Sequence, residues 1–401
     1  MTATTPRGPS RAPGPARQDD AAGQALTVMV SGATDPAMLG QWDDLVAAHP
    51  LADVTQLSAW TRIRALAGYR AVHVLVRDGN GLVGGAQVLV RRLRGLGLFG
   101  YVPYGPVVSP AVEDPDRVHD TLADALADLG RRRFRMLFVQ PPEGAEPASR
   151  ALLGRGFRHS DADVAPAASL HVDLRQDEAA LRAGLSKRLR TWTNSWEERG
   201  VGVRLGEEED LPLLAELLGE TAEHQGFTPF DAEYLRTMYR ELAPSGHLVF
   251  FIGEAAGRPV ATTVLTACGS VVKVRFLGLA RHDDGRRLNV PGAVYWTAMR
   301  WAKDAGYDWF DFGGILPESI PALLTDGAVD LDALAGPDRF KARFGGSAYL
   351  YPPPVELIPS AVVRWSYDVA RGSTVGRRAV AWAKRRSRAG GRTGTRASAE
   401  R

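Results

Sequence analysis

A lysine and an aspartate stand in two short runs that are rich in aromatic residues and glycine. Lys341 follows Phe340 in the run Phe-Lys-Ala-Arg-Phe-Gly-Gly, residues 340–346, and Asp311 lies shortly before a glycine pair. A lysine ammonium is a compact charge that stabilises an oxyanion or binds phosphate. Asp311 would order the site or orient an amine. The structural alternatives are an amphipathic turn with a snorkelling lysine and a carboxylate that caps the glycine turn.

The sequence lacks the motifs of several other catalytic chemistries. No Gly-x-Ser-x-Gly run marks a serine nucleophile, Cys268 has no neighbouring base, and the eight histidines lack the spacing of metal ligands. Nucleophilic and metal-assisted hydrolysis are therefore disfavoured, and we predict no cofactor and no metal.

Two similar series of elements would position these residues. Each series consists of two helices, a β-hairpin, a third strand, a helix and a final strand. We expect the first series at residues 35–48, 56–66, 71–76, 82–92, a segment ending at 106, 117–129 and 134–140, and the second at 211–223, 232–242, 248–253, 259–267, 271–279, 291–305 and 307–312. A repeat at this scale predicts duplicated α/β domains.

Length and composition agree with two globular domains. The chain has 401 residues, of which 45% are hydrophobic and 24% are charged, values typical of globular proteins. We expect a disordered tail at 1–24, a first domain at 25–175 that residues of about 350–385 complete, a second domain at 176–349, and a basic disordered tail at 386–401. The start lacks the apolar core of a signal peptide, and no stretch approaches the ~20 apolar residues of a membrane span, which predicts a cytoplasmic protein.

The net charge of +3 is unevenly distributed along the chain. From Arg371 onward, ten Lys or Arg residues stand against one acidic residue, Glu400. Such a tail would bind RNA phosphate, contact the inner face of an anionic membrane, or remain a solvated disordered segment. No DNA partner is predicted.

Five segments resemble the Fem family, a branch of the GNAT acyltransferase superfamily whose members use aminoacyl-tRNA to build the interpeptide bridges of peptidoglycan. The most specific are residues 307–314 and 340–346, which occur in the family's order; the weaker ones are 56–64, 102–107 and 185–200. The resemblance covers residues 56–344 and implies an α/β fold with mixed sheets, arranged as two tandem GNAT-like domains. Only about ten residues separate Gly200 from Leu211, so the chain resembles compact members without a coiled-coil insertion.

The resemblance assigns the donor side of the site to the second half of the chain. The lysine that matches Lys341 lies at the tRNA end of family sites, and the residue that matches Phe340 helps to frame the acyl channel. Arg188, on a basic helix expected at residues 185–200, would contact the tRNA backbone. Its alternative is the solvated face of a helix that joins two domains.

On the acceptor side the resemblance is only partly kept. Arg64 stands where compact relatives have a cation, and it would grip a diphosphate or a carboxylate or lie exposed on its helix. Tyr104, in a Pro-Tyr-Gly-Pro turn, and Tyr234 match acceptor-side positions. Phe230 and Phe276 stand where relatives have an arginine and a tyrosine. These two changes weaken a nucleotide-linked peptide as the acceptor and leave a lipid-linked precursor or a different amine open.

These observations predict an aminoacyltransferase that moves an amino acid from aminoacyl-tRNA to an amine of a lipid-linked or nucleotide-linked peptidoglycan precursor. A close variant would form the same bond on a small natural product. An acyl-CoA-dependent transferase is the competing class, but residues 286–293 keep only half of the pyrophosphate-binding pattern, since Val290 replaces its central glycine and Pro291 lacks an N–H. A duplicated fold kept as a non-enzymatic binding subunit is the third alternative.

Overall fold

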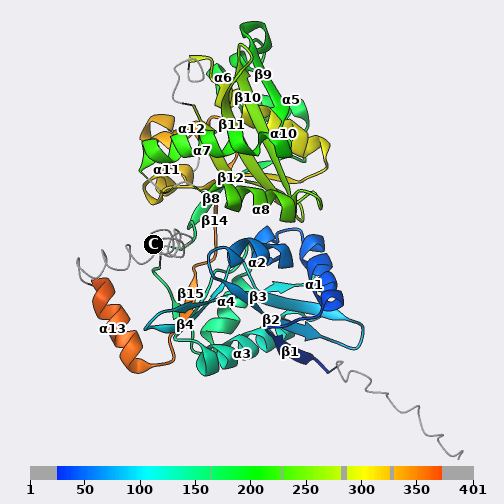
Figure 1. The fold of residues 1–401 in the computed structure, drawn as a ribbon, viewed down its shortest axis with the longest axis vertical. Coiled ribbons are helices and arrows are strands. Elements are labelled where there is room, and N and C mark those ends of the chain that lie inside the picture. The colour runs from blue at the N-terminus through cyan, green and yellow to red at the C-terminus, as the bar shows by residue number, and fades with distance from the viewer. Residues whose placement is uncertain are drawn as a thin grey trace, which may run out of the picture.

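The computed structural model describes residues 25–372, apart from residues 163, 227, 229, 281–286 and 326–328. Within these residues, two β-sheets lie one beyond the other along the long axis of the molecule (Figure 1). Each sheet mixes parallel and antiparallel strands and is flanked by helices. The predicted α/β fold with two mixed sheets is confirmed. The tails predicted at 1–24 and 386–401 lie outside the described residues.

The first half of the chain builds an eight-stranded sheet that helices cover on both faces. Its elements are β1 (Thr27–Ser31), α1 (Pro36–Ala48), α2 (Ser58–Ala65), β2 (Arg70–Arg77), β3 (Leu82–Leu93), β4 (Gly97–Val102), β5 (Val107–Val108), α3 (Pro115–Arg133), β6 (Met136–Val139), α4 (Glu146–Leu153), β7 (Arg158–His159) and β15 (Val355–Leu357). The strand order is β1-β2-β3-β4-β6-β15-β7, with β5 paired to β3. On β2, Val74 packs in the core beside α3, whereas Leu75 packs with α1 and α2, because successive side chains of a strand point to opposite faces.

The second half repeats this architecture around a seven-stranded sheet. Its elements are β8 (Ala168–Asp173), α5 (Glu178–Gly184), α6 (Lys187–Trp192), β9 (Val201–Leu205), α7 (Leu211–Gln225), α8 (Ala232–Leu242), β10 (Leu248–Ala255), β11 (Arg258–Cys268), β12 (Val271–Leu279), α10 (Val290–Asp304), β13 (Trp309–Gly314), α11 (Ile320–Leu323), α12 (Gly336–Ala342) and β14 (Ser347–Leu350). Helix α13 (Ala361–Gly372) follows β15 and lies beside the first half. The strand order is β14-β8-β13-β12-β11-β10-β9. Phe250 packs with α7 and α8, and Phe251 packs with α10 on the opposite face.

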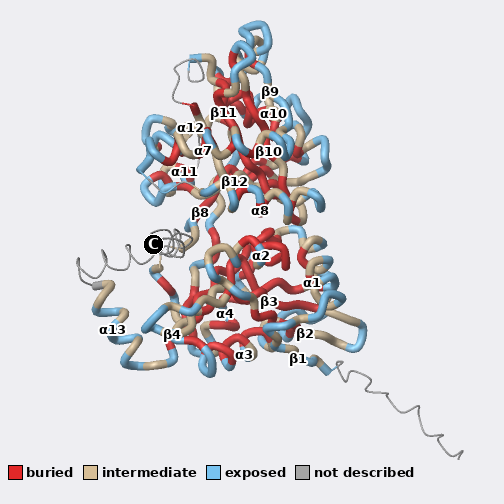
Figure 2. The backbone as a smooth tube through the Cα atoms, in the orientation of Figure 1, coloured by how far each residue is buried: buried red, intermediate tan, exposed pale blue. Residues whose placement is uncertain are grey.

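A continuous apolar core joins the two halves. Trp42 of α1 and Trp60 of α2 pack in one buried cluster with Leu235 of α8 and Phe250 of β10. Figure 2 shows that the strands of both sheets are largely buried. Each buried large side chain contributes roughly 1.5–3 kcal/mol relative to exposure, so this shared core holds the halves together as one unit.

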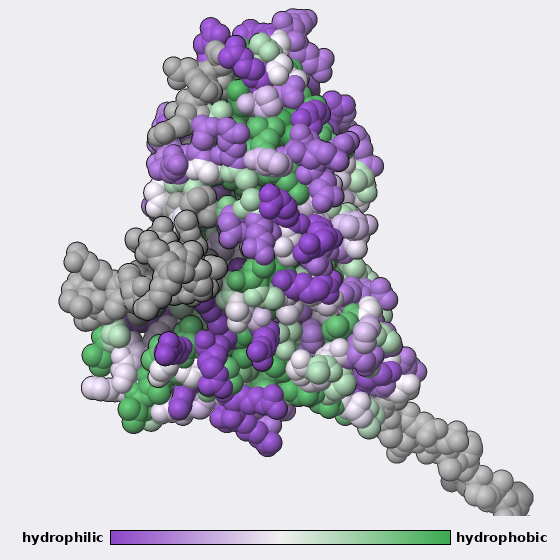
Figure 3. Space-filling view, in the orientation of Figure 1, coloured by the Kyte–Doolittle hydropathy of each residue, from purple (hydrophilic) through white to green (hydrophobic). Residues whose placement is uncertain are grey.

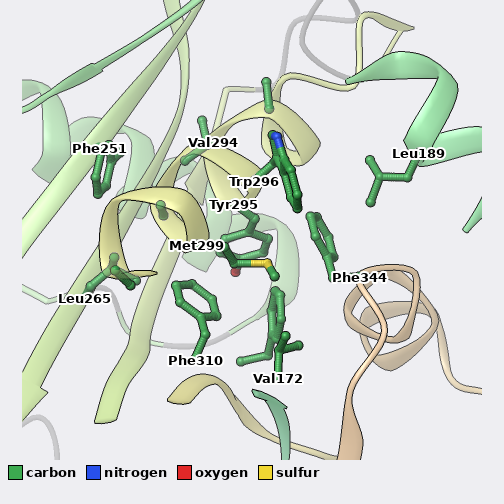
Figure 4. Close-up of a cluster of buried hydrophobic side chains, with 14 of the residues drawn as sticks. Val172, Leu189, Phe251, Leu265, Val294, Tyr295, Trp296, Met299, Phe310 and Phe344 are labelled. Carbon is green, nitrogen blue, oxygen red and sulfur yellow. The ribbon is translucent and has the colours of Figure 1, made fainter. Parts of the chain in front are cut away.

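A second buried cluster positions α10 and α12 of the second half. Tyr295 lies edge-on to Phe312 and Phe344, with ring centroids 5.3 and 5.6 Å apart, and Figure 4 shows Tyr295, Trp296 and Phe344 converging from helices and loops distant in the sequence. Phe344 is 1% exposed. The turn that carries residues 340–346 is therefore anchored in the core.

The chain crosses between the sheets between β7 and β8, and it returns through β15. β8 pairs with β13 and β14 of the second sheet, because Leu170 and Val172 complete the core of that half. The second sheet thus begins before residue 175, the domain boundary predicted from the sequence. β15 inserts between β6 and β7 of the first sheet, within the stretch that the sequence assigns to the first domain.

The predicted single helix over residues 185–200 is wrong in its extent. The structure has α6 at Lys187–Trp192 and a separate 3-10 helix at Glu197–Arg199. Thr193, Asn194 and Ser195 intervene, and such side chains compete with the helix for backbone hydrogen bonds. The basic residues of α6 are consequently held on one short helix.

The turn between β11 and β12 touches the first half of the chain so closely that it requires glycine. Gly269 has φ +55°, and a Cβ at this position would lie 2.6 Å from the carbonyl oxygen of Pro50 and against that of His49. The adjacent amide of Ser270 donates to Pro50 O at 2.9 Å. We expect Gly269→Ala to lower the free energy of unfolding by about 3 kcal/mol in urea titrations, since it combines a left-handed alanine with a wedge between the halves.

Gly257→Ala is the matched control for this prediction. Gly257 also has positive φ, +74°, in the β10–β11 turn, but a Cβ there meets no atom within 4 Å. This variant should lose only about 1 kcal/mol. Equal losses for the two variants would contradict the close approach at Gly269.

Candidate functional site

Four charged side chains form a buried ionic cluster where the two halves meet. Asp53, from the loop before α2, lies 2.6 Å from Arg275 and 3.3 Å from Lys273, both on β12. Lys273 is also 3.3 Å from Asp311 on β13. Lys273 and Arg275 share one face of their strand, and Lys273 stands opposite Asp311 in the parallel pairing of β12 with β13. The strand register itself therefore brings these charges together.

Mutual pairing determines the ionisation of this cluster. Burial alone would raise the pKa of Asp53, but Arg275 and Lys273 outweigh it and hold that pKa well below its usual range. Burial likewise opposes the ionised form of Asp311, and Lys273 and His171 reverse the effect and lower its pKa. Both carboxylates are charged near neutral pH, so each buried cation has a partner.

A small pocket opens beside this cluster. It is lined by residues of both halves, and we call it the junction pocket: Leu51, Ala52, Asp53, Val54, Tyr104, Glu143, Thr266, Cys268, Val271, Lys273, Arg275, Asp311 and Tyr351. Lys273 Nζ lies over the rings of Tyr104 and Tyr351 at 4.6 and 5.2 Å. The site residues Asp311 and Tyr104, both predicted from the sequence, thus lie in one pocket.

Glu143 reaches this pocket from the loop after β6 and meets a buried histidine. His171 of β8, 4% exposed, places Nδ1 3.5 Å from Glu143 Oε1 and Nε2 3.4 Å from Asp311 Oδ2. Burial raises the pKa of Glu143, against the smaller opposing effect of His171. Cys268 is no nucleophile here, because burial raises the pKa of its thiol to about 12.

A second pocket lies at the start of α10. We call it the arginine pocket; it is lined by Arg188, Leu189, Asn289, Phe340 and Arg343. α10 begins beside this pocket, but Pro291 lacks an N–H and the amides of Gly292 and Ala293 donate to Asn289 O, so the positive charge of the pocket comes from the two arginines. The pocket can bind an anionic group against one aromatic wall, and it joins the predicted residues Arg188 and Phe340.

Lys341 lies beside this pocket with its ammonium turned toward β13. Its Nζ donates to the carbonyl oxygen of Gly314 at 2.5 Å and is 3.5 Å from Asp338 Oδ1. Burial lowers the pKa of Lys341, whereas Asp338 and, more weakly, Asp311 raise it. Lys341 therefore stands between Phe340 of the arginine pocket and the strand that carries Asp311.

The remaining predicted residues form an aromatic cluster that does not line the junction pocket. Phe230 stacks on Tyr234 and packs against Phe276, with ring centroids 4.9 and 4.4 Å apart. Burial raises the pKa of Tyr234, and Arg64 and Arg275 oppose the rise. The guanidinium of Arg64 also lies over the ring of Tyr69 at 4.9 Å. Arg64, Phe230, Tyr234 and Phe276 are thus neighbours, whereas Tyr104 lies in the junction pocket.

Several residues of these pockets were not predicted from the sequence as site residues. The cations Lys273 and Arg275 alternate with apolar residues on an interior strand, a pattern that requires buried partners and could have identified them. Asp53 and Glu143 carry no comparable signal, since only the packing of the halves brings them to the cluster. His171 reaches the cluster through the pairing of β8 with β13, in which it stands opposite Asp311. Within the described residues, no group of three or more His, Cys, Asp and Glu side chains could hold a metal ion. No helix in that part of the chain has the length and apolar character to span a bilayer.

Known proteins share this fold and part of the sequence. A family model described as an acetyltransferase (GNAT) domain matches residues 174–341. Lipid II:glycine glycyltransferase of Staphylococcus saprophyticus subsp. saprophyticus is 25% identical over 231 residues, 54% of this chain and 55% of that protein, and the Staphylococcus aureus protein of that name is 25% identical over 223 residues, 52% of each. The chain spans about half the length of these curated relatives. The crystal structure of FemX matches with a TM-score of 0.70 at 18% identity over 85% of this chain and 99% of that chain, which confirms the predicted tandem fold.

The ionic cluster makes a prediction about stability. Asp53→Asn would leave Lys273 and Arg275 with less negative charge than they need in a buried site, and we expect a loss of about 3 kcal/mol in the free energy of unfolding. Because the pKa values of Asp53 and Asp311 are lowered in the fold, their stabilisation is present above the unfolded pKa of about 4 and is lost as the pH falls below it. Urea titrations from about pH 7 down to about pH 3 should show that acidification lowers the free energy of unfolding less in the variant than in the unchanged protein.

Asp210→Asn provides the comparison at the surface. Asp210 pairs with Arg204 at 2.7 Å, but the arginine side chain is 45% exposed, so solvent screens the pair. The loss in this variant should be much smaller. A loss of unfolding free energy in Asp210→Asn that equals or exceeds the loss in Asp53→Asn would show that the buried cluster stabilises the fold no more than a surface ion pair does.

Proposed function

We propose that this chain transfers an aminoacyl group from aminoacyl-tRNA to an amine of a lipid-linked peptidoglycan precursor, at the cytoplasmic face of the membrane. The match of residues 174–341 to a GNAT acetyltransferase domain and the 25% identity to lipid II:glycine glycyltransferases support this proposal. The observation that carries the proposal is the arginine pocket, in which Arg188, Arg343 and Phe340 adjoin Lys341. The name of the staphylococcal relatives, lipid II:glycine glycyltransferase, supports this acceptor.

The arginine pocket has the composition that the end of a charged tRNA needs. Arg188 and Arg343 would pair with the phosphates of the terminal nucleotides. Phe340 offers a face for base stacking or for the aminoacyl group. Lys341, one residue further along α12, would then stabilise the oxyanion that forms on the ester carbonyl.

The start of α10 argues against the competing acyl-CoA chemistry. Pro291 lies in the first turn of this helix and lacks an N–H, and Asn289 has φ 48°. A pyrophosphate cradle needs successive backbone N–H groups at this place. Two arginine side chains supply the positive charge here instead. Two separate side chains suit the single phosphates between tRNA nucleotides better than they suit a pyrophosphate.

The transfer reaction needs a group to accept a proton from the amine. As the amine nitrogen bonds to the carbonyl carbon, the bond from that carbon to the ribose oxygen breaks, and the ribose leaves as an alcohol. Glu143 would take the proton of the attacking amine, with His171 and Asp311 holding its environment. The proton finally resides on the ribose hydroxyl, so the reaction is balanced without a cofactor.

The aromatic cluster bears on the acceptor. The aromatic rings of three residues, Phe230, Tyr234 and Phe276, pack against one another, and the guanidinium of Arg64 lies beside Tyr234. Such a surface suits an acceptor with apolar groups and an isolated anionic group better than a dense series of phosphates. The same composition is compatible with a small natural-product amine, which is the second candidate acceptor.

Lys341 gives the first test of this proposal. Purified full-length protein should transfer amino acids from a pool of charged tRNAs to a lipid-linked muropeptide, read by mass spectrometry. Lys341→Ala should slow the transfer about a hundredfold, the usual effect of removing one key electrostatic group. Parallel assays with nucleotide-linked muropeptide and small amines identify the acceptor class.

Neighbouring cations on α6 provide the control for the donor side. Arg188→Ala should raise the KM for aminoacyl-tRNA, whereas Lys187→Ala removes an exposed charge of the same helix outside the arginine pocket and should not. Unchanged transfer by Lys341→Ala would remove Lys341 from the mechanism. Tight acetyl-CoA binding with acyl transfer independent of tRNA would overturn the proposed function.

Glu143 makes a second prediction, on pH dependence. Because burial raises the pKa of Glu143, the rate should fall as the pH is lowered through that raised value and the carboxylate becomes protonated. Glu143→Gln should reduce the rate by about a hundredfold and remove this limb of the pH profile. Glu146→Gln, an exposed neighbour at the start of α4, should preserve both. Retention of the wild-type profile in Glu143→Gln would exclude Glu143 as the proton acceptor.

A further inference from the structure

Helix α13 exposes a stripe of large apolar side chains. Val362, Trp365 and Val369 are 73%, 67% and 52% exposed. Their spacing of three and four residues places them along one side of the helix, since each residue advances by about 100°. Figure 3 shows hydrophobic atoms at the surface where Figure 1 places α13. An exposed tryptophan within such a stripe indicates a binding surface.

The opposite side of α13 is tied to the first half of the protein. Asp368 accepts two hydrogen bonds from Arg158, at 2.6 and 2.9 Å, and Arg158 also pairs with the buried Glu356 of β15. Arg371 donates to Tyr367 Oη at 3.0 Å and to the carbonyl oxygen of Asp161. Turning the apolar stripe inward would break these contacts. The attachment therefore fixes the stripe toward the outside.

The charge around the stripe favours a lipid surface as its occupant. Arg364 is exposed on the same helix, and the sequence from residue 373 to 401 contains nine Lys or Arg and one Glu. A helix with Trp and aliphatic residues on one side and adjoining cations is typical of helices that lie in the interface of anionic bilayers. A stable dimer needs roughly 800 Å² of buried surface per partner, far more than three side chains provide.

We propose that α13 docks this protein onto an anionic membrane, with Val362, Trp365 and Val369 inserted among the lipids. The inference is independent of the proposed transfer reaction.

Sedimentation of the full-length protein with vesicles tests the docking surface. We expect binding to vesicles of phosphatidylcholine with phosphatidylglycerol, little binding to phosphatidylcholine alone, and weaker binding at high salt. The triple variant V362S/W365S/V369S should bind the anionic vesicles at least about tenfold more weakly, because it loses the inserted apolar groups. Leu205→Ser, a change at a 49% exposed leucine of β9, should bind as the unchanged protein does.

Brominated lipids test the insertion of Trp365 directly. Trp365→Phe should retain vesicle binding but lose most of the fluorescence quenching that bromine in the acyl chains causes. Equal binding by the triple variant would overturn the proposal, as would quenching that survives in Trp365→Phe. Self-association that the triple variant abolishes, without vesicle binding by the unchanged protein, would assign the stripe to a second copy of the chain instead. Circular dichroism of each variant controls for folding.

Discussion

The relative placement of the two halves depends on one shared ammonium group. Lys273 lies 3.3 Å from Asp53 of the first half and 3.3 Å from Asp311 of the second. Apolar contacts such as those around Trp42 and Phe250 favour association but tolerate small sliding. Buried ion pairs do not, since a displaced partner leaves a desolvated charge that costs several kcal/mol. The cluster therefore selects one register for the junction, and the surrounding apolar core supplies most of the cohesion.

The same two strands that carry these charges also lead to the donor side. β13 continues from Asp311 to Gly314, whose carbonyl oxygen holds the ammonium of Lys341. Asp311 weakly raises the pKa of Lys341. β12 and β13 pair only from Val271 to Lys273 and from Trp309 to Asp311. The junction pocket and the arginine pocket are thus arranged along one strand.

Local patterns predicted the fold. Helical spacing and proline positions located α1 and α10 to within a residue or two at each end, and the runs around Asp311 and Phe340 contain residues that line the two pockets. Periodicity could not assign β8 to the second sheet, because an apolar strand fits either core. Sequence alone also could not pair Asp53 with Arg275, which are 222 residues apart. Their contact depends on how two complete domains pack.

The distribution of charge within the junction pocket determines which of its carboxylates can accept a proton. Three carboxylates line this pocket, those of Asp53, Glu143 and Asp311. Asp53 and Asp311 are bound to the cations Lys273 and Arg275, and a proton added to either would leave buried positive charge uncompensated. Glu143 has the opposite balance, since burial raises its pKa and its ion-pair contact in the described part of the chain is the weaker one with His171. The ion pairs that fix the junction thereby leave Glu143 as the carboxylate most able to take a proton.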